Sequence, residues 1–358
     1  MNSLPDRLSR LIRQDVQSMH AYAVQDATGM IKLDAMENPH RLPPALQEAL
    51  GRRLAGVAMN RYPGARLDDL RIALARYAGL PVGCGLMLGN GSDELISLLA
   101  MACDVPGASV LAPLPGFVMY GMSAQLQGLK FIGVDLTPDF ELDEAAMLAA
   151  IERHQPSIIY LAYPNNPTAN LWDDAVIERI VQAAPGLVVI DEAYQPFSSR
   201  IYLDRLAARP HVLLMRTLSK FGLAGVRIGY MMGAQALIEQ IDKVRPPYNV
   251  SVLNAEAALF ALEHADEYAQ QAAGLREQRG ALMRQLRDLP AVKAWPSDAN
   301  MILVRVPDAQ AAFDGMKRRG VLVKNVSKMH PLLANCLRLT VGTPDENAQM
   351  MYALQASL

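Results

Sequence analysis

The chain has 358 residues, of which 51% are hydrophobic and 20% are charged, and its formal net charge is -2. This composition is typical of an ordinary globular protein and excludes a disordered chain, and the near-neutral charge argues against a nucleic-acid-binding surface. Residues 1–14 are charged without an apolar core, and no apolar run approaches the thickness of a bilayer, so we predict neither a secretory signal nor a membrane span.

The cysteines and histidines predict no metal site. Cys84, Cys103 and Cys336 are few, odd in number and far apart, which favours buried thiols in a reducing cytoplasm over a disulfide or a metal cluster. The six histidines are scattered without the paired spacing of zinc ligands. The length suggests about two domains.

The first part of the chain is predicted to form an N-terminal arm over residues 1–30, with one amphipathic helix at 6–14. Apolar residues at helical spacing predict further helices at 44–54 and 67–78. A glycine-containing stretch, Leu88 to Glu94, then leads into an apolar helix at 95–102. We expect Ser92 to cap this helix, whose free amides would favour an anion; a capped helix with nothing bound stays open as the alternative.

From residue 109 onward, short apolar runs alternate with helical patterns. Such alternation predicts an α/β fold with a mostly parallel sheet flanked by helices. The predicted strands cover 109–112, 129–134, 157–162, 187–190, 212–215 and 227–232, and the predicted helices cover 115–127, 144–154, 173–184 and 236–243.

A proline-rich stretch, 245–248, interrupts this alternation and suggests a hinge. A long helical region at 252–289 follows, and after it come predicted strands at 301–306, 321–323 and 336–341 with helices at 309–319 and 345–356. We predict an arm of residues 1–30, a large domain of residues 46–248, and a small α+β domain made of residues 31–45 and 249–358.

The stretch from Val212 to Tyr230 gives the first indication of chemistry. It begins as a short apolar run typical of a buried strand and then presents Lys220 among small and hydroxyl-bearing residues. Partial burial lowers the pKa of a lysine and makes its amine nucleophilic, as Schiff-base formation requires. A surface loop with an ordinary lysine stays open as the alternative at this point.

Polar residues also follow two other predicted strands. Asn165 and Asn166 come after the strand at 157–162, and Asp191 and Tyr194 come after the strand at 187–190. Taken singly, such residues are often turn or cap residues. Because the carboxyl ends of parallel strands share one edge of a sheet, these side chains and Lys220 are predicted to converge on one crevice.

This set of motifs resembles the fold type I pyridoxal-phosphate aminotransferases, in the branch that contains aspartate and histidinol-phosphate aminotransferases. The segments around Glu37-Asn38-Pro39 and Arg338 are most similar to the histidinol-phosphate branch. The matching segments span most of the chain in the family's order and are Asn165–Thr168, Asp191–Tyr194, Ser219–Arg227 and Leu337–Thr343.

The resemblance implies pyridoxal 5'-phosphate as the cofactor. Lys220 would hold it as a Schiff base and then move the substrate's α-proton, Asp191 would face the ring nitrogen, and Tyr194 would face the phenolic oxygen. Phe117 would stack on the ring, although core packing stays open for it. The other cofactor-binding residues that the resemblance implies are Gly91, Ser92, Asp93, Asn166, Thr217, Ser219, Arg227 and Tyr62 of the partner subunit.

On the substrate side, the resemblance implies that Arg338 clamps the anionic end of the substrate, because a guanidinium binds a carboxylate or a phosphate in two-point fashion. The further substrate-binding residues that it implies are Tyr22, Asn38, Tyr120 and Lys324. Lys324 stands where the histidinol-phosphate branch leads us to expect a second arginine, and Ala169 stands where the family often has glycine. Surface placement stays open for Tyr22, and its segment lacks the Pro-Gly often seen there. These departures concern the substrate rather than the chemistry.

The activity implied by the resemblance is transamination of L-histidinol phosphate with 2-oxoglutarate to imidazole acetol phosphate and glutamate, in histidine biosynthesis, by a cytoplasmic homodimer. An aromatic amino acid aminotransferase or a threonine-phosphate decarboxylase of the same fold stays open. A cofactor-binding regulator is disfavoured because the chain is not basic and has no spare DNA-binding segment. A nicotinamide-dependent dehydrogenase would rest on glycines 89 and 91 without the full dinucleotide fingerprint.

Overall fold

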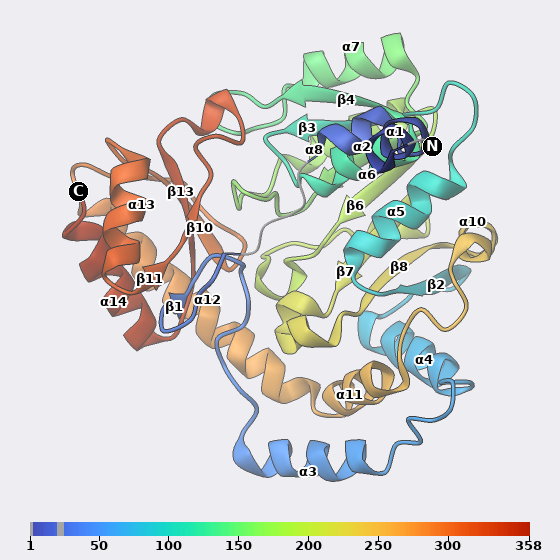
Figure 1. The fold of residues 1–358 in the computed structure, drawn as a ribbon, viewed down its shortest axis with the longest axis horizontal. Coiled ribbons are helices and arrows are strands. Elements are labelled where there is room, and N and C mark those ends of the chain that lie inside the picture. The colour runs from blue at the N-terminus through green and yellow to red at the C-terminus, as the bar shows by residue number, and fades with distance from the viewer. Residues whose placement is uncertain (1–2, 20–24) are drawn as a thin grey trace.

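The computed structural model describes residues 3–19 and 25–358 and is built around a seven-stranded sheet with the order β2-β8-β7-β6-β5-β3-β4 (Figure 1). Strand β8 runs antiparallel to both of its neighbours, and the other six strands are parallel to one another, which confirms the predicted α/β class. The strands are Cys84–Gly89 (β2), Ser109–Leu114 (β3), Lys130–Asp135 (β4), Ile158–Ala162 (β5), Leu187–Asp191 (β6), Val212–Thr217 (β7) and Gly229–Ala234 (β8).

Helices cover both faces of this sheet, because successive residues of a buried strand point to opposite sides. On one face, residues such as Val189 and Met215 pack against α5 (Ser92–Ala102), α6 (Met119–Gln127) and α10 (Gln235–Ile241). On the other face, residues such as Ile190 and Leu214 share a core with α4 (Arg66–Ala78), α7 (Glu144–His154), α8 (Asp174–Ala183), α9 (Leu203–Leu206) and α11 (Val252–Glu263).

The C-terminal part of the chain forms a second core around an antiparallel sheet with the order β12-β13-β10-β9. Its strands are Lys293–Ala294 (β9), Met301–Arg305 (β10), Lys324–Asn325 (β12) and Cys336–Thr340 (β13), and its helices are α12 (Ala265–Arg287), α13 (Ala309–Arg318) and α14 (Pro344–Gln355). Strand β1 (Ile31–Lys32) joins this part by pairing with β11 (Val321–Leu322). The exact division into domains stays a prediction.

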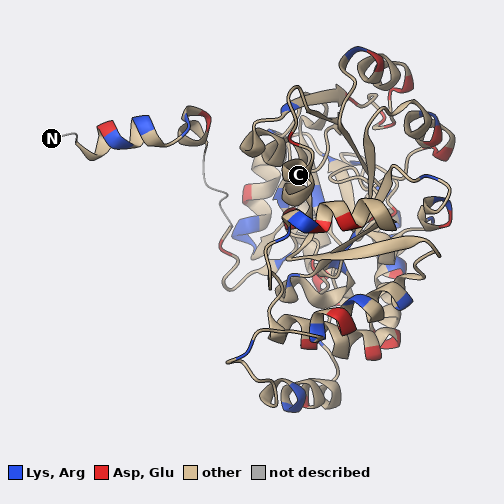
Figure 2. Cartoon of the chain, turned by 90° about the vertical axis from the view of Figure 1, so that its right-hand side faces the viewer, with Lys and Arg blue, Asp and Glu red and all other residues tan. Residues whose placement is uncertain are grey.

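The N-terminal arm projects from the body of the molecule (Figure 2). The single helix expected at 6–14 is wrong, because the arm contains α1 (Leu4–Leu11) and α2 (Gln14–Ser18) with extended backbone at Ile12 between them. Arg13 holds the arm to α6 by donating from Nη1 to the Leu126 carbonyl oxygen over 2.6 Å. Helix α3 is Pro44–Ala55. Within the described ranges, no helix combines the length and the apolarity that a membrane crossing requires.

Three further differences from the predicted elements have local causes. The helical region expected at 252–289 is divided at His264, whose φ of -116° and ψ of 33° lie outside the helical range. The helix expected from 115 begins at Met119, after a loop that leaves the end of β3. Strand β2 was not predicted because Gly85 and Gly89 weaken the strand pattern, although both are required there by close contacts with Gln235 and Leu95.

Candidate active site

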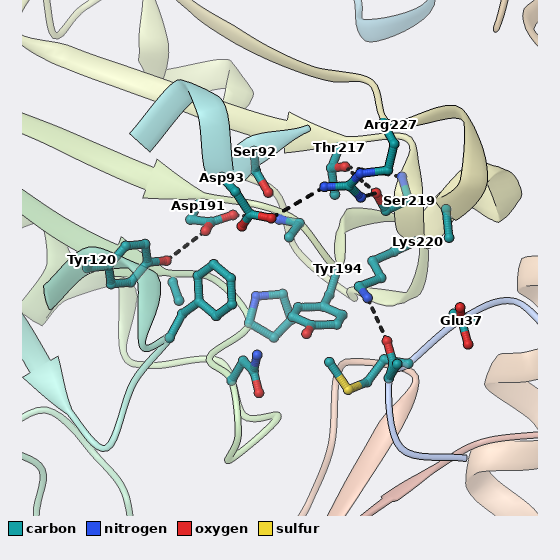
Figure 3. A pocket seen from close by; sticks show the side chains of 18 of the residues that line it. Glu37, Ser92, Asp93, Tyr120, Asp191, Tyr194, Thr217, Ser219, Lys220 and Arg227 are labelled. Atoms are coloured by element: carbon teal, nitrogen blue, oxygen red, sulfur yellow. Dashed lines mark hydrogen bonds and ion pairs between the residues drawn. The ribbon is translucent and has the colours of Figure 1, made fainter. Parts of the chain in front are cut away.

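A cavity of about 350 Å³ opens at the carboxyl edge of the seven-stranded sheet (Figure 3). The ends of β5, β6 and β7, the start of α5 and the segment 35–37 all contribute to its lining. The structure therefore brings together most of the cofactor residues expected from the sequence: Ser92, Asp93, Phe117, Asn166, Asp191, Tyr194, Thr217, Ser219, Lys220 and Arg227. Tyr120 lines the same cavity.

Asp191 lies at the end of β6, where its carboxylate is 4% exposed. The Tyr120 hydroxyl donates to Asp191 Oδ2 over 2.6 Å, and the amide of Ala193 donates to Oδ1 over 3.0 Å. Burial raises the pKa of Asp191 to about 6, against the opposing effect of these two donors. The Tyr120 ring is itself fixed by stacking on Tyr160 at a centroid distance of 4.3 Å. Tyr120 thus supports the acid more directly than it faces a substrate.

Lys220 lies in the single wide turn Ser219–Leu223 that follows β7. Its Nζ donates to the carbonyl oxygen of Ala35 over 2.8 Å and lies 5.9 Å from the centre of the Tyr194 ring. Burial, and secondly the charge of Arg338, lowers the pKa of Lys220 to about 8. The turn depends on Gly222, whose φ is 137° and whose missing side chain would lie 2.8 Å from the Tyr268 ring.

Hydroxyl groups and an arginine gather near the start of α5. Arg227 donates from Nη1 to Ser219 Oγ over 3.3 Å and from Nη2 to Asp93 Oδ2 over 3.3 Å, and Thr217 Oγ1 accepts from the amide of Ser219 over 3.1 Å. Free backbone amides at a helix start, hydroxyls and a guanidinium are together the donor set of a phosphate site.

The expectation that Ser92 caps α5 is wrong. Gly91 occupies the cap position, and glycine offers no side chain to the free amides there. Glycine is required because its φ is 84° and because a Cβ at this position would lie 2.6 Å from Arg227 Nη2. Ser92 is consequently the first residue of the helix, and its side chain lines the cavity instead.

The two asparagines that follow β5 make different contacts. Asn165 is buried and holds its own loop by donating to the Pro115 carbonyl and to Thr168 Oγ1. Asn166 lines the cavity, and its Oδ1 accepts a hydrogen bond from Arg338 Nη1 over 2.7 Å. The loop then passes through Ala169 at a φ of 65°, a conformation that explains why glycine is frequent at this point in the family it resembles.

Arg338 comes from β13 of the second sheet and is 7% exposed. Its Nη2 donates to the Asp34 carbonyl oxygen over 2.7 Å. Lys324 is the direct partner of Arg338 on β12, so both side chains leave the same face of that sheet. These two cations are therefore neighbours, and Arg338 meets the cavity wall at Asn166.

Two expected site residues, Asn38 and Tyr62, lie away from this arrangement. Asn38 donates to Gln271 Oε1 over 2.9 Å and lines a hollow next to the cavity rather than the cavity itself. Tyr62 is 76% exposed and stacks on Tyr248 at a centroid distance of 4.3 Å. Tyr22 lies outside the described residues. Tyr62 is thus exposed and is not part of the cavity lining.

Some residues of the site were missed at the level of sequence. Glu37 lines the cavity and forms an ion pair with Lys32. The carbonyl oxygen of Asp34 accepts a hydrogen bond from Arg338, and that of Ala35 accepts one from Lys220. Backbone acceptors leave no trace in residue type, so no pattern could have identified them. Glu37 could have been found from its place in the Glu-Asn-Pro motif.

Comparison with known proteins places this arrangement in context. The model of the family "Aminotransferase class I and II" matches residues 28–354. The chain is 73% identical to a histidinol-phosphate aminotransferase of Methylibium petroleiphilum, over 99% of this chain and 96% of that protein, and 72% identical to a histidinol-phosphate aminotransferase of Polaromonas naphthalenivorans, over 100% and 99%. The crystal structure of a histidinol-phosphate aminotransferase from Sinorhizobium meliloti in complex with pyridoxal-5'-phosphate is similar with a TM-score of 0.85, at 26% identity over 96% of each chain.

Proposed function

The chain belongs to the class I and II aminotransferase family, and from that premise we propose that it is the pyridoxal-phosphate-dependent aminotransferase of L-histidinol phosphate in histidine biosynthesis. The single observation that carries the proposal is the 73% identity to a histidinol-phosphate aminotransferase over 99% of the chain. The amino group would pass to 2-oxoglutarate, which gives imidazole acetol phosphate and glutamate.

The donor set in the cavity fits pyridoxal 5'-phosphate. A buried acid at one end suits a ring nitrogen, a buried lysine suits an aldehyde, and the hydroxyls and arginine near the start of α5 suit a phosphate. When bound, the cofactor supplies an aldehyde that condenses with amines and a ring that accepts electrons from the α-carbon. In this proposal Asp191 holds the ring nitrogen and Lys220 holds the aldehyde. The phosphate is held by Ser92, Asp93, Thr217, Ser219 and Arg227, and Gly91 leaves room for it.

Asp191 would hold the ring nitrogen of the cofactor and, while ionised, would favour a proton on that nitrogen. Its pKa of about 6 leaves the carboxylate mostly charged at neutral pH, and the hydrogen bond from Tyr120 favours that charged form. Phe117, which lines the cavity edge-on to Tyr120 at a centroid distance of 5.5 Å, covers the ring region and excludes water.

Lys220 acts first as a nucleophile and then as the group that moves the proton at the substrate's α-carbon. Both tasks need a neutral amine, and the lowered pKa of about 8 makes that form accessible near neutral pH. Tyr194, which is buried beside it, and Asn166 provide hydrogen-bonding groups for the phenolic oxygen. Burial raises the pKa of Tyr194, so its hydroxyl stays a donor.

Arg338 binds the anionic end of each substrate in turn. A guanidinium accommodates a phosphate or a carboxylate, which suits a reaction that uses a phosphorylated amino alcohol and an oxo acid. Lys324, on the adjacent strand, adds a second positive charge for the phosphate. Its ammonium acts as a point charge, whereas a second arginine would offer two parallel N–H donors to the phosphate. Tyr22 and Asn38 complete the proposed substrate side.

We also propose that the chain works as a homodimer in the cytoplasm. Tyr62 and Tyr248 form an exposed aromatic pair, and large exposed aromatic side chains are typical of interfaces. In the dimer, Tyr62 of the partner subunit would reach the cofactor phosphate. Sedimentation of the purified protein tests the assembly, and a sedimentation coefficient of a monomer would contradict it.

A substrate panel on cofactor-loaded protein tests the function. L-Histidinol phosphate with 2-oxoglutarate should give glutamate at a higher kcat/KM than aromatic amino acids or aspartate give. Threonine phosphate belongs in the same panel, with carbon dioxide measured, because a decarboxylase of this fold would release it. The proposal fails if histidinol phosphate is not turned over.

A further inference from the structure

Two adjacent acids end strand β6 and point to opposite sides of the sheet. Asp191 faces the cavity, whereas the side chain of Glu192 enters the opposite side and is 1% exposed. Strand β7 repeats this division, because Thr217 lines the cavity and the preceding residue, Arg216, is 4% exposed and meets Glu192. A buried ion pair therefore lies directly behind two residues that we place at opposite ends of the cofactor.

The contacts of this pair are close and directional. Arg216 donates from Nε to Glu192 Oε2 over 2.8 Å, and its Nη2 lies 2.7 Å from the same oxygen. The other carboxylate oxygen, Oε1, accepts the amide of Tyr202. Both oxygens of Glu192 are thus engaged, and its carboxylate is held in one orientation.

The pair lies just past the point where the backbone ladder between the two strands stops. The last register pair of β6 and β7 is Asp191 with Met215, and the Glu192 amide then donates to the Met215 carbonyl over 2.8 Å. Beyond this bond β7 continues alongside β8 only, up to Thr217. The Glu192–Arg216 contact spans the two strands where the ladder no longer does.

Burying two charges carries a desolvation penalty that an apolar pair of similar volume would avoid. An apolar pair packs without direction, whereas this pair fixes the spacing and the angle of the strand ends. A cofactor that is held at its ring nitrogen and at its phosphate at the same time needs such fixed spacing between the groups that hold it. Figure 3 shows Asp191, at the end of β6, and Thr217 and Lys220, at the end of β7 and in the turn after it, facing one cavity.

We propose that Glu192 and Arg216 are positioning residues that set the separation between the ring-binding Asp191 and the phosphate-binding Thr217 and Ser219. Neither side chain lines the main cavity, so they act through these neighbours rather than on the cofactor itself. This inference rests on the proposed function, since it assumes that the cavity holds pyridoxal phosphate.

The test is a titration of cofactor-free protein with pyridoxal phosphate, for the wild type and for Glu192→Gln, which keeps the shape of the side chain and removes its charge. We expect the Kd for the cofactor to rise at least about tenfold in the variant. We also expect a shifted absorbance maximum of the bound cofactor, because Asp191 would no longer meet the ring nitrogen in its present geometry. A purely structural pair would lower thermal stability and leave both readouts unchanged.

The matched control is Glu256→Gln, which removes an ion-pair partner of Arg53 and Arg66 away from the cavity. Its Kd for the cofactor should stay within about twofold of the wild-type value. The absorbance maximum of its bound cofactor should be unchanged. If Glu192→Gln fails to fold by circular dichroism, Arg216→Lys decides the question, because it keeps the buried charge and loses only the fork. A folded Arg216→Lys should show a smaller rise of Kd in the same direction.

The outcomes separate the two proposals. A wild-type protein that does not bind pyridoxal phosphate would overturn the proposed function. A wild type that binds it, with a folded Glu192→Gln or Arg216→Lys that binds equally well and gives the same spectrum, would overturn the positioning role alone.

Discussion

The two sides of the cavity are built in different ways. On the cofactor side, the groups come from neighbouring strand ends of one sheet and from α5, which packs on that sheet. On the substrate side, Arg338 comes from the second sheet and meets Asn166 of the first and the carbonyl of Asp34 from the N-terminal segment. We infer from this difference that the cofactor is held mainly by the strand ends of one sheet, whereas substrate recognition is assembled between two sheets.

The largest effect is expected on the cofactor side, from Lys220→Ala. Loss of both the nucleophile and the proton carrier should lower kcat by about 10⁴-fold or more, because positioned proton transfer alone contributes about 10²–10⁴-fold. Single-turnover measurements on loaded protein would show it. The matched control is Lys324→Ala on the substrate side, where kcat should change far less; an equal loss in both variants would remove the distinction between the two sides.

The next effect is expected from Asp191→Asn, which should lower kcat by about 10²–10³-fold because a neutral amide cannot hold the ring proton. The thermal stability of the cofactor-free variant should rise at high pH, although its kcat falls. The folded pKa of about 6 exceeds the ordinary 3.8, so the stability that this group contributes is present below pH 3.8 and lost as the pH rises through 6. Cofactor-free Asp191→Asn should therefore gain in Tm relative to the wild type at pH 8 but not at pH 4, and a uniform loss would contradict the buried charge.

A smaller effect, confined to the substrate, is expected from Arg338→Gln. The KM for both substrates should rise about 10- to 100-fold, since a charge-assisted bond is worth about 1.5–3 kcal/mol. The Kd for the cofactor should stay within about twofold, because Arg338 bonds to Asn166 and is not one of the described residues that line the cavity. Steady-state kinetics and a cofactor titration on the same preparation measure the two quantities. A cofactor Kd that rises as much as KM would show that the two sides are not separable.

The smallest effect is expected in the pH dependence of cofactor capture, which links Lys220 on the cofactor side to Arg338 on the substrate side. The amine of Lys220 is neutral above its pKa of about 8, so the rate at which cofactor-free protein captures pyridoxal phosphate should rise about tenfold from pH 7 to pH 9 and then level off. The charge of Arg338 contributes to the low value, so Arg338→Gln should move the midpoint upward. Stopped-flow absorbance gives both curves, and identical midpoints would exclude the coupling.

The cofactor side was predictable from the sequence because its residues follow three parallel strands whose apolar patterns are clear. Asp191, Lys220 and Asn166 could be assigned to one sheet edge from that rule alone, and the structure brings them to one cavity. The capping of α5 was not predictable, since Gly91 is selected by its φ of 84° and by the nearness of Arg227, neither of which is a pattern in the chain.

The substrate side was less predictable because it depends on contacts between distant segments. The hydrogen bond from the Tyr120 hydroxyl to Asp191, 71 positions further along the chain, could not be foreseen from the sequence. The carbonyls of Asp34 and Ala35 are equally invisible to residue type. Strand β2 was missed for a related reason, since its glycines lie against Gln235 and Leu95 from other segments.

The one antiparallel strand of the main sheet has a consequence for the family's history. Thr217 at the end of β7 pairs with Gly229 at the start of β8. The two ends of the connection that carries Lys220 and Arg227 are therefore fixed next to each other. An insertion or a deletion inside this connection would displace one of the two residues. We therefore expect its length to be nearly invariant among relatives, while connections at the other edge of the sheet tolerate residues gained or lost.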